Sequence, residues 1–277
     1  MHPTGEGTHQ LTLRDRSVNL VDRGKRAPLL LVHGFPLDHT IWATQIETFA
    51  PERRVIAPDL VGFGRSGPEG RTSLDDHADD LVALLDILGV DRAVVVGLSM
   101  GGYVALALWQ RHPSRCAGLV LACSRAGADS EAGRAGRYQM AIAVGERGVA
   151  AVAEALLPRI LGAEAGDALR DEVRATMQRQ PPAGVIAALK AMAARADFTA
   201  LLPGLALPVL VVCGAEDALI PVAESRAMVR QAPGARLVVV PGAGHLVCRE
   251  QPGAFNAALR AFLEAVDGRA PHAPSSV

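Results

Sequence analysis

The sequence predicts an α/β protein with a mostly parallel sheet flanked by helices. Short runs of apolar, β-branched residues alternate along the chain with segments at helical spacing. Most of these runs are apolar throughout, as in strands that are covered on both faces in a parallel sheet. One long stretch without a convincing strand interrupts the alternation and predicts a helical insertion.

Six apolar runs are the candidate core strands. In chain order they are 29–34, 54–60, 93–99, 117–123, 207–214 and 235–242. Between the second and third runs, apolar residues from Leu74 to Leu88 recur at helical spacing. Ser73 is placed to cap this helix, and Asp75 and Asp76 fall in its first turn, where the helix dipole favours negative charge.

The predicted insertion covers residues 125–202. It contains Ala-rich helical stretches such as 149–160 and 183–196, with no convincing strand between them. We therefore expect an α/β core formed by residues 1–124 and 203–277, with a helical lid inserted at 125–202.

Composition and charge limit the classes of function. The chain has 277 residues, which is long enough to bury a sizeable core. Its 28 Lys and Arg residues nearly balance 29 Asp and Glu residues, so the charge gives no reason to expect nucleic acid or an anionic membrane as a partner. The polar start and the lack of a long apolar run predict a cytoplasmic protein without a membrane span. The composition is compatible with a homo-oligomer.

The cysteines predict neither a disulfide framework nor a zinc site. They are far apart, form no CxxC pair, and three of them lie in or beside apolar runs. We expect buried free thiols at Cys116, Cys123, Cys213 and Cys248. No metal or cofactor site is expected.

Residues 94–105 read VVVGLSMGGYVA and place Ser99 between two glycines, directly after a run of valines. A strand that ends at Gly97 and a helix that begins near Met100 make Gly-x-Ser-x-Gly a sharp turn, in which the serine is exposed in strained geometry. The free N–H groups at the start of the helix favour an oxygen that carries negative charge. The pattern predicts that Ser99 is a nucleophile.

A serine hydroxyl needs a base to take its proton, and the base needs an acid to fix its tautomer. Asp217 lies in CGAEDALIP, just after one predicted strand, and His245 lies in PGAGHLVCREQP, after the last one. Both follow the carboxyl ends of strands, at the sheet edge expected for Ser99. Ser99, Asp217 and His245 are therefore the candidate catalytic residues.

Five segments together resemble the α/β-hydrolase fold family, over essentially residues 15 to 265. In chain order they are HGFP, PDLVGFGRS, GLSMG, GAEDALIP and GAGHLVCREQP. The resemblance implies a serine-nucleophile enzyme with His245 as base and Asp217 as its orienting acid. It also implies an oxyanion hole formed by the backbone N–H groups of Phe35 and Met100.

Within this family, HGFPLDHTIW, SRAGAD and the lid length look closest to carboxylesterases and 3-oxoadipate enol-lactonase-like hydrolases. The implied activity is cleavage of a carboxylic ester or lactone through an acyl-Ser99 intermediate, without metal or organic cofactor. The alternatives are a cofactor-free haloperoxidase or perhydrolase, a hydrolase of carbon–carbon bonds, and a catalytically silent binder of a small ligand.

A small-molecule substrate would lie on an apolar floor and under the lid. We expect the floor to contain Phe35, Leu98, Met100 and Trp42. The start of the lid carries Arg125, Arg134, Arg137 and Tyr138. These arginines are either solvated side chains in an Arg-rich chain or a clamp for a substrate carboxylate. Arg125, Arg137 and Tyr138 are thus the candidate substrate-binding residues of the lid.

Other residues near these motifs are interpreted as structural. His33 adjoins the oxyanion loop, whereas Asp59 and Arg65 are expected to hold the PDLVGFGRS loop in shape. His77 lies among carboxylates and is expected to be a solvated surface residue. The glycines of the loop do not match a nucleotide-binding pattern.

Overall fold

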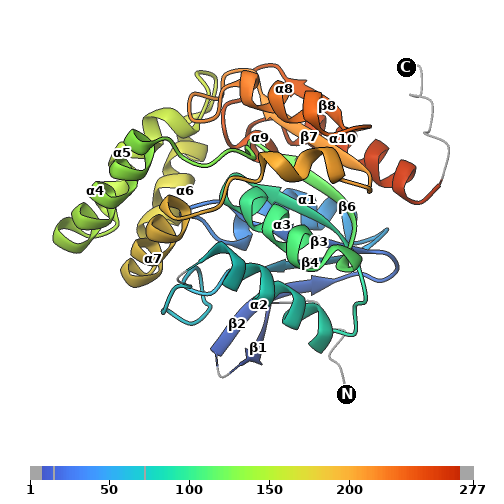
Figure 1. Cartoon of the computed structure of the whole chain (residues 1–277). Coiled ribbons are helices and arrows are strands. Elements are labelled where there is room, and N and C mark those ends of the chain that lie inside the picture. The colour runs from blue at the N-terminus through green and yellow to red at the C-terminus, as the bar shows by residue number, and fades with distance from the viewer. Residues whose placement is uncertain (1–7, 15, 72, 269–277) are drawn as a thin grey trace.

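The computed structural model describes residues 8–14, 16–71 and 73–268, and these ranges form an eight-stranded sheet flanked by helices (Figure 1). The strand order is β1-β2-β4-β3-β5-β6-β7-β8. The two pairings made by β2 are antiparallel, and all pairings from β4 to β8 are parallel. The predicted α/β class with a mostly parallel sheet is confirmed.

The predicted core strands are confirmed as β3 to β8. The strands are β1 (Thr8–Leu13), β2 (Arg16–Arg23), β3 (Pro28–Val32), β4 (Arg54–Pro58), β5 (Ala93–Leu98), β6 (Cys116–Ala122), β7 (Val209–Gly214) and β8 (Arg236–Val240). The hairpin of β1 and β2 lies outside the predicted strands. Exposed positions recur along β1, as expected for an edge strand with one face open to solvent, so it lacks a continuous apolar run.

The helices follow the predicted alternation with the strands. They are α1 (Ala43–Phe49), α2 (Leu74–Ile87), α3 (Met100–Arg111), α4 (Glu131–Arg147), α5 (Ala150–Ile160), α6 (Asp167–Gln178), α7 (Pro182–Ala193), α8 (Val222–Gln231), α9 (Val247–Glu250) and α10 (Pro252–Val266). Short 3-10 helices are η1 (His39–Trp42), η2 (Pro113–Arg115) and η3 (Thr199–Gly204). The predicted cap of α2 is confirmed, because the Ser73 side chain accepts a hydrogen bond from the N–H of Asp76 and the Asp76 carboxylate accepts one from Ser73.

Each face of the sheet contributes to its own apolar core. In β5, Val95 packs into the core that contains α2 and α3, whereas Val94 and Val96 pack into the core that contains α1 and α10. Because successive side chains point to opposite faces and both faces are covered, the strand is apolar at every position.

The helices α4 to α7 extend from one end of the sheet, between β6 and η3 (Figure 1). They fall within residues 125–202, which we term the helical insertion, and its described residues contain no strand. That this segment is a separate lid domain stays a prediction. None of the helices in the described part of the chain is both long and apolar enough to cross a bilayer.

Candidate active site

Ser99 lies in a strained turn between β5 and α3. Its backbone angles are φ 53° and ψ −113°, a region that residues with a side chain rarely adopt. This turn is held by hydrogen bonds to β6 and to the residues that directly follow β6. The Ser99 N–H donates to the carbonyl of Ala122 at 2.8 Å, and the Ser124 hydroxyl donates to the carbonyl of Ser99 at 2.9 Å.

The glycines on both sides of Ser99 are required by crowding. A Cβ atom on Gly97 would lie 2.2 Å from the carbonyl oxygen of Gly101, and one on Gly101 would lie 2.2 Å from that of Val32. Both distances are far below van der Waals contact, so only glycine fits at these positions. The Gly-x-Ser-x-Gly pattern therefore has a steric cause in this fold.

Asp217 and His245 form a buried pair at the carboxyl ends of β7 and β8. A carboxylate oxygen of Asp217 (Oδ2) lies 2.8 Å from Nδ1 of His245. The other oxygen accepts hydrogen bonds from the N–H groups of Leu219 and Ile220, each at 2.9 Å. With its proton on Nδ1, held by Asp217, the imidazole has Nε2 free to accept a proton.

Cys123 lies close to this pair. It directly follows β6, the strand next to β5. Its sulfur, a ring nitrogen of His245 and a carboxylate oxygen of Asp217 all lie within 4.8 Å of one another. The described structure thus places Ser99, Asp217 and His245 at the same edge of the sheet, after β5, β7 and β8. All four cysteines are buried and free, as expected.

The loop after β3 passes close to Ser99. A Cβ atom built on Gly34 would lie 3.4 Å from Cβ of Ser99, so Phe35 begins within reach of the turn. Among the described residues, no acceptor pairs with the backbone N–H of Phe35 or of Met100. Two unpaired N–H donors beside the Ser99 turn could hold a developing oxyanion.

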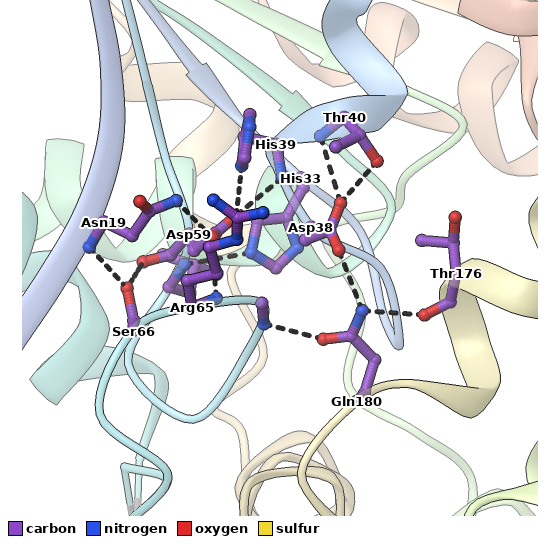
Figure 2. Close-up of polar contacts among 12 residues, drawn as sticks. Asn19, His33, Asp38, His39, Thr40, Asp59, Arg65, Ser66, Thr176 and Gln180 are labelled. Atoms are coloured by element: carbon purple, nitrogen blue, oxygen red, sulfur yellow. Dashed lines mark hydrogen bonds and ion pairs between the residues drawn. The ribbon is translucent and has the colours of Figure 1, made fainter. Parts of the chain in front are cut away.

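A buried polar network connects this loop to the loop after β4 (Figure 2). His33 accepts a hydrogen bond from the Leu60 N–H on Nε2 at 3.0 Å, and burial lowers the pKa of His33, which keeps this nitrogen neutral. Asp59 accepts hydrogen bonds from the N–H groups of His39, at 2.8 Å, and Arg65, at 2.9 Å. The structural interpretation of His33 and Asp59 is confirmed.

The helical insertion docks on the same loop through Asp38. Arg179 donates to both carboxylate oxygens of Asp38, at 2.7 to 3.0 Å. Gln180 donates to Asp38 at 3.0 Å and accepts from the Gly64 N–H at 2.7 Å (Figure 2). The junction of α6 and α7 therefore contacts the loop that carries Phe35 and the loop after β4.

Two of the three arginines predicted at the start of the insertion, Arg125 and Arg137, meet at one buried carboxylate. Asp129 forms ion pairs with Arg125 and Arg137, and with the fully buried Arg195 at 2.9 Å. Arg195 also donates to the carbonyl of Gly127 at 2.7 Å. This cluster, which we term the Asp129 cluster, ties together the two chain segments that join the insertion to the core. Sequence reasoning missed Asp129 and Arg195, since nothing in the local pattern marks them.

The remaining substrate-binding predictions fall in different environments. Leu98 is buried in the sheet, and Trp42 is completely buried, with its ring 6.0 Å from that of Phe255 in α10. Tyr138 is 45% exposed on α4, and Arg134 is also exposed. Contact of Phe35, Leu98, Trp42, Arg125, Arg137 or Tyr138 with substrate stays a prediction.

The expectation that His77 is a solvated surface residue is wrong. Its side chain is buried in the core formed with Leu74 and Leu81 on the inner face of α2, and neither ring nitrogen has a hydrogen-bond partner among the described residues. Burial, with smaller contributions from His33 and Arg71, lowers the pKa of His77 to about 3. The neighbouring carboxylates point elsewhere: Asp80, for example, pairs with Arg71.

Two groups of described residues bring possible metal-binding atoms together. One is Cys123, Asp217 and His245, and the other is Asp38, His39 and Asp59. The carboxylates of both groups already accept hydrogen bonds from protein donors, described above. This donor set suits a hydrogen-bonded network better than a cation site.

Comparison with known proteins shows similarity over most of the chain. Residues 27–252 match a family model described as the alpha/beta hydrolase fold. A dihydrolipoyllysine-residue acetyltransferase component of the acetoin cleaving system of Pseudomonas putida is 35% identical over 85% of this chain, which spans only 63% of that protein. A pimeloyl-[acyl-carrier protein] methyl ester esterase of Edwardsiella ictaluri is 30% identical, over 89% of this chain and 95% of the relative.

Solved structures are similar over nearly the whole chain. A thermophilic esterase from Thermogutta terrifontis has a TM-score of 0.90 and 39% identity, covering 94% of this chain and 99% of the esterase. An enol-lactonase from Burkholderia xenovorans has a TM-score of 0.85 and 27% identity, covering 92% of this chain and 99% of the lactonase.

Proposed function

The chain belongs to the alpha/beta hydrolase fold family, and from this premise we propose that it is a serine hydrolase that cleaves a carboxylic ester or lactone. The observation that carries the proposal is the buried Asp217–His245 pair, 2.8 Å apart, at the sheet edge that also bears the strained Ser99. The esterases and the enol-lactonase among similar proteins support this substrate class.

In the proposed reaction, His245 takes the proton of the Ser99 hydroxyl as the serine oxygen attacks the carbonyl carbon. Asp217 holds the imidazole in the required tautomer and stabilises its charged form. The proton then passes from His245 to the leaving alkoxide, which leaves an acyl-Ser99 ester. Water, deprotonated by His245, hydrolyses this ester and regenerates the serine.

The negative charge of each tetrahedral intermediate would be held by the N–H groups of Phe35 and Met100. Such donors are effective because they are already oriented when the charge develops. Met100 also begins α3, so its N–H carries the partial positive charge of a helix start.

The first test is labelling with an active-site phosphonate, together with turnover of p-nitrophenyl esters of increasing chain length and of lactones. We expect the phosphonate to modify Ser99. Asp217→Asn should lower kcat by about 10⁴-fold, because it removes the charge and favours the wrong tautomer of His245. Asp79→Asn is a matched control, since Asp79 in α2 pairs at 2.7 Å with His112, which follows the end of α3 opposite to Ser99.

Other outcomes would favour the other candidates. Activity only in a peracid assay favours a perhydrolase, and activity only on diketone acids favours a carbon–carbon bond hydrolase. An unlabelled Ser99 and no turnover of any ester would favour a silent binder.

A variant of the Asp129 cluster tests whether the substrate carries a negative charge. If Arg137 clamps a substrate carboxylate, Arg137→Ala should lower kcat/KM for an acidic ester by about 10²-fold and leave a matched neutral ester nearly unchanged. Equal effects on both esters would assign Arg137 to the cluster alone.

A further inference from the structure

Glu250, the last residue of α9, lies beside the loop that carries His245, and its side chain is partly buried. One carboxylate oxygen (Oε2) accepts a hydrogen bond from the Gly244 N–H at 3.0 Å. The other (Oε1) accepts one from the Leu246 N–H at 3.0 Å. A single carboxylate therefore binds the backbone on both sides of His245.

The same carboxylate reaches the helical insertion. Its Oε2 atom also accepts a hydrogen bond from the Gly162 N–H, just after α5, at 2.6 Å. The N–H of His245 itself donates to the carbonyl of Ile160, in the last turn of α5, at 3.1 Å. The loop of His245 and the end of α5 are thus joined, with Glu250 as the shared acceptor.

The charges around His245 and Glu250 are few. Asp217 contacts the imidazole directly, and the sulfur of Cys123 lies within 4.8 Å of it. Burial raises the pKa of Glu250 above its usual value, and its backbone hydrogen bonds and the charge of His245 offset only part of this rise. Glu250 therefore lies close enough to His245 for the two side chains to interact electrostatically.

Other charged side chains near Glu250 have partners of their own. Arg170 donates to the carbonyl of Gly162 at 2.9 Å, and Arg249 pairs with Glu172 at 2.7 Å. Glu216 is exposed and accepts a hydrogen bond from the Ala163 N–H at 3.1 Å.

We propose that Glu250 is a positioning residue for His245. Its carboxylate holds the loop so that the imidazole stays aligned for proton transfer with Ser99, and its negative charge stabilises the imidazolium that forms during the reaction. This inference rests on the proposed function, in which His245 is the base.

The test is Glu250→Gln, measured by kcat, KM and the pH profile of kcat/KM. The amide has one acceptor oxygen, and its NH₂ group would oppose a backbone N–H, so at least one hydrogen bond is lost. We expect kcat to fall by about 10²-fold with little change in KM. We also expect the pH of half-maximal kcat/KM to move down by roughly half a unit, because a negative charge near the imidazole is removed.

Two further variants distinguish the alignment of His245 from the effect of the Glu250 charge and from general damage to the fold. Glu216→Gln is the matched control, since it alters a neighbouring carboxylate that also binds the insertion but does not accept from the residues beside His245. It should keep both kcat and the pH midpoint. Glu250→Asp retains the charge on a shorter side chain, and it should lower kcat without moving the midpoint. It also supplies a readout if Glu250→Gln does not fold.

The titration of the His245 ring, followed by NMR, needs no substrate and gives the same comparison. Wild-type protein that neither reacts with phosphonate nor turns over esters would contradict the proposed function, whereas the NMR midpoint would still test Glu250. Wild-type kcat and an unchanged midpoint in Glu250→Gln would overturn the proposal. So would a loss of kcat without a shift of the midpoint, or equal losses in Glu216→Gln.

Discussion

At the scale of single residues, the candidate site combines strain with burial. Ser99 holds backbone angles that suit glycine, and the crowding at Gly97 and Gly101 leaves the turn no room to relax. Asp217 is buried but has every carboxylate oxygen occupied by a donor. Strain and buried charge both lower stability, so each is expected where function requires it.

The strain at Ser99 can be measured by removing the side chain in two steps. Ser99→Ala and Ser99→Gly should both lose turnover, by about 10⁴- to 10⁶-fold. Only Ser99→Gly should also gain stability, by about 1 kcal/mol, because glycine adopts this conformation without a Cβ clash. Urea unfolding of the two variants gives the comparison. Equal stability of Ser99→Gly and Ser99→Ala would mean that the turn is unstrained.

At the scale of elements, the helical insertion packs on the core through apolar side chains and is also held by specific polar contacts. Asp38 receives Arg179 and Gln180, Glu250 receives the end of α5, and the Asp129 cluster joins the two connecting segments. Burial raises the pKa of Asp129, but its hydrogen bonds and the charges of Arg137 and Arg195 hold it below the usual value. The carboxylate is therefore ionised and neutralises part of a buried positive cluster.

Removing this carboxylate should destabilise the protein strongly. Asp129→Asn would leave Arg195 fully buried without its charge partner, and we expect a loss of about 3–5 kcal/mol in the free energy of unfolding. Asp171→Asn is the control, because Asp171 pairs with Arg174 on an exposed face and should cost less than about 1 kcal/mol. Chemical denaturation of both variants measures the difference. Similar small losses would show that the Asp129 cluster does not stabilise the junction.

At the scale of the whole molecule, His77 couples folding to pH. Its pKa is about 3 in the folded protein, whereas an unfolded chain binds the proton near the usual value of about 6.5. The unfolded state thus binds more protons below that pH. The contribution of His77 to stability is complete above about pH 6.5 and is lost by about 1.4 kcal/mol per unit as the pH falls toward 3.

His77→Leu should remove this dependence and an unpaired buried polar group at once. Between pH 7 and pH 5, the wild-type protein should lose about 2 kcal/mol more stability than His77→Leu. Guanidinium unfolding at the two pH values, with His112→Gln at a half-buried position as control, measures the effect. Equal losses of stability in the wild type and in His77→Leu would mean that the buried His77 does not cause the pH dependence.

Local patterns were sufficient to predict the six core strands and the candidate residues. Continuous apolar runs identify strands buried on both faces, and a serine between glycines at a strand end identifies the turn. Chain order then places Asp217 and His245 after later strands, because parallel strands present their carboxyl ends at one edge. β1 was missed because its alternating exposure gives only a weak strand signal, and β2 was missed because the polar Asn19 interrupts its apolar run.

By itself, the sequence determined the α/β class, the positions of the core strands along the chain and which residues could form the Ser99, Asp217 and His245 set. Only the tertiary structure decided which polar side chains become buried and paired. Asp129 and Arg195 are far apart in sequence, and Glu250 meets Gly162 through the packing of α5 against the loop of His245. His77 illustrates the same point, since its neighbours in sequence are carboxylates, yet its side chain is buried on the inner face of α2. The physical reason is that burial and charge pairing depend on distances between segments, which no local spacing of residues encodes.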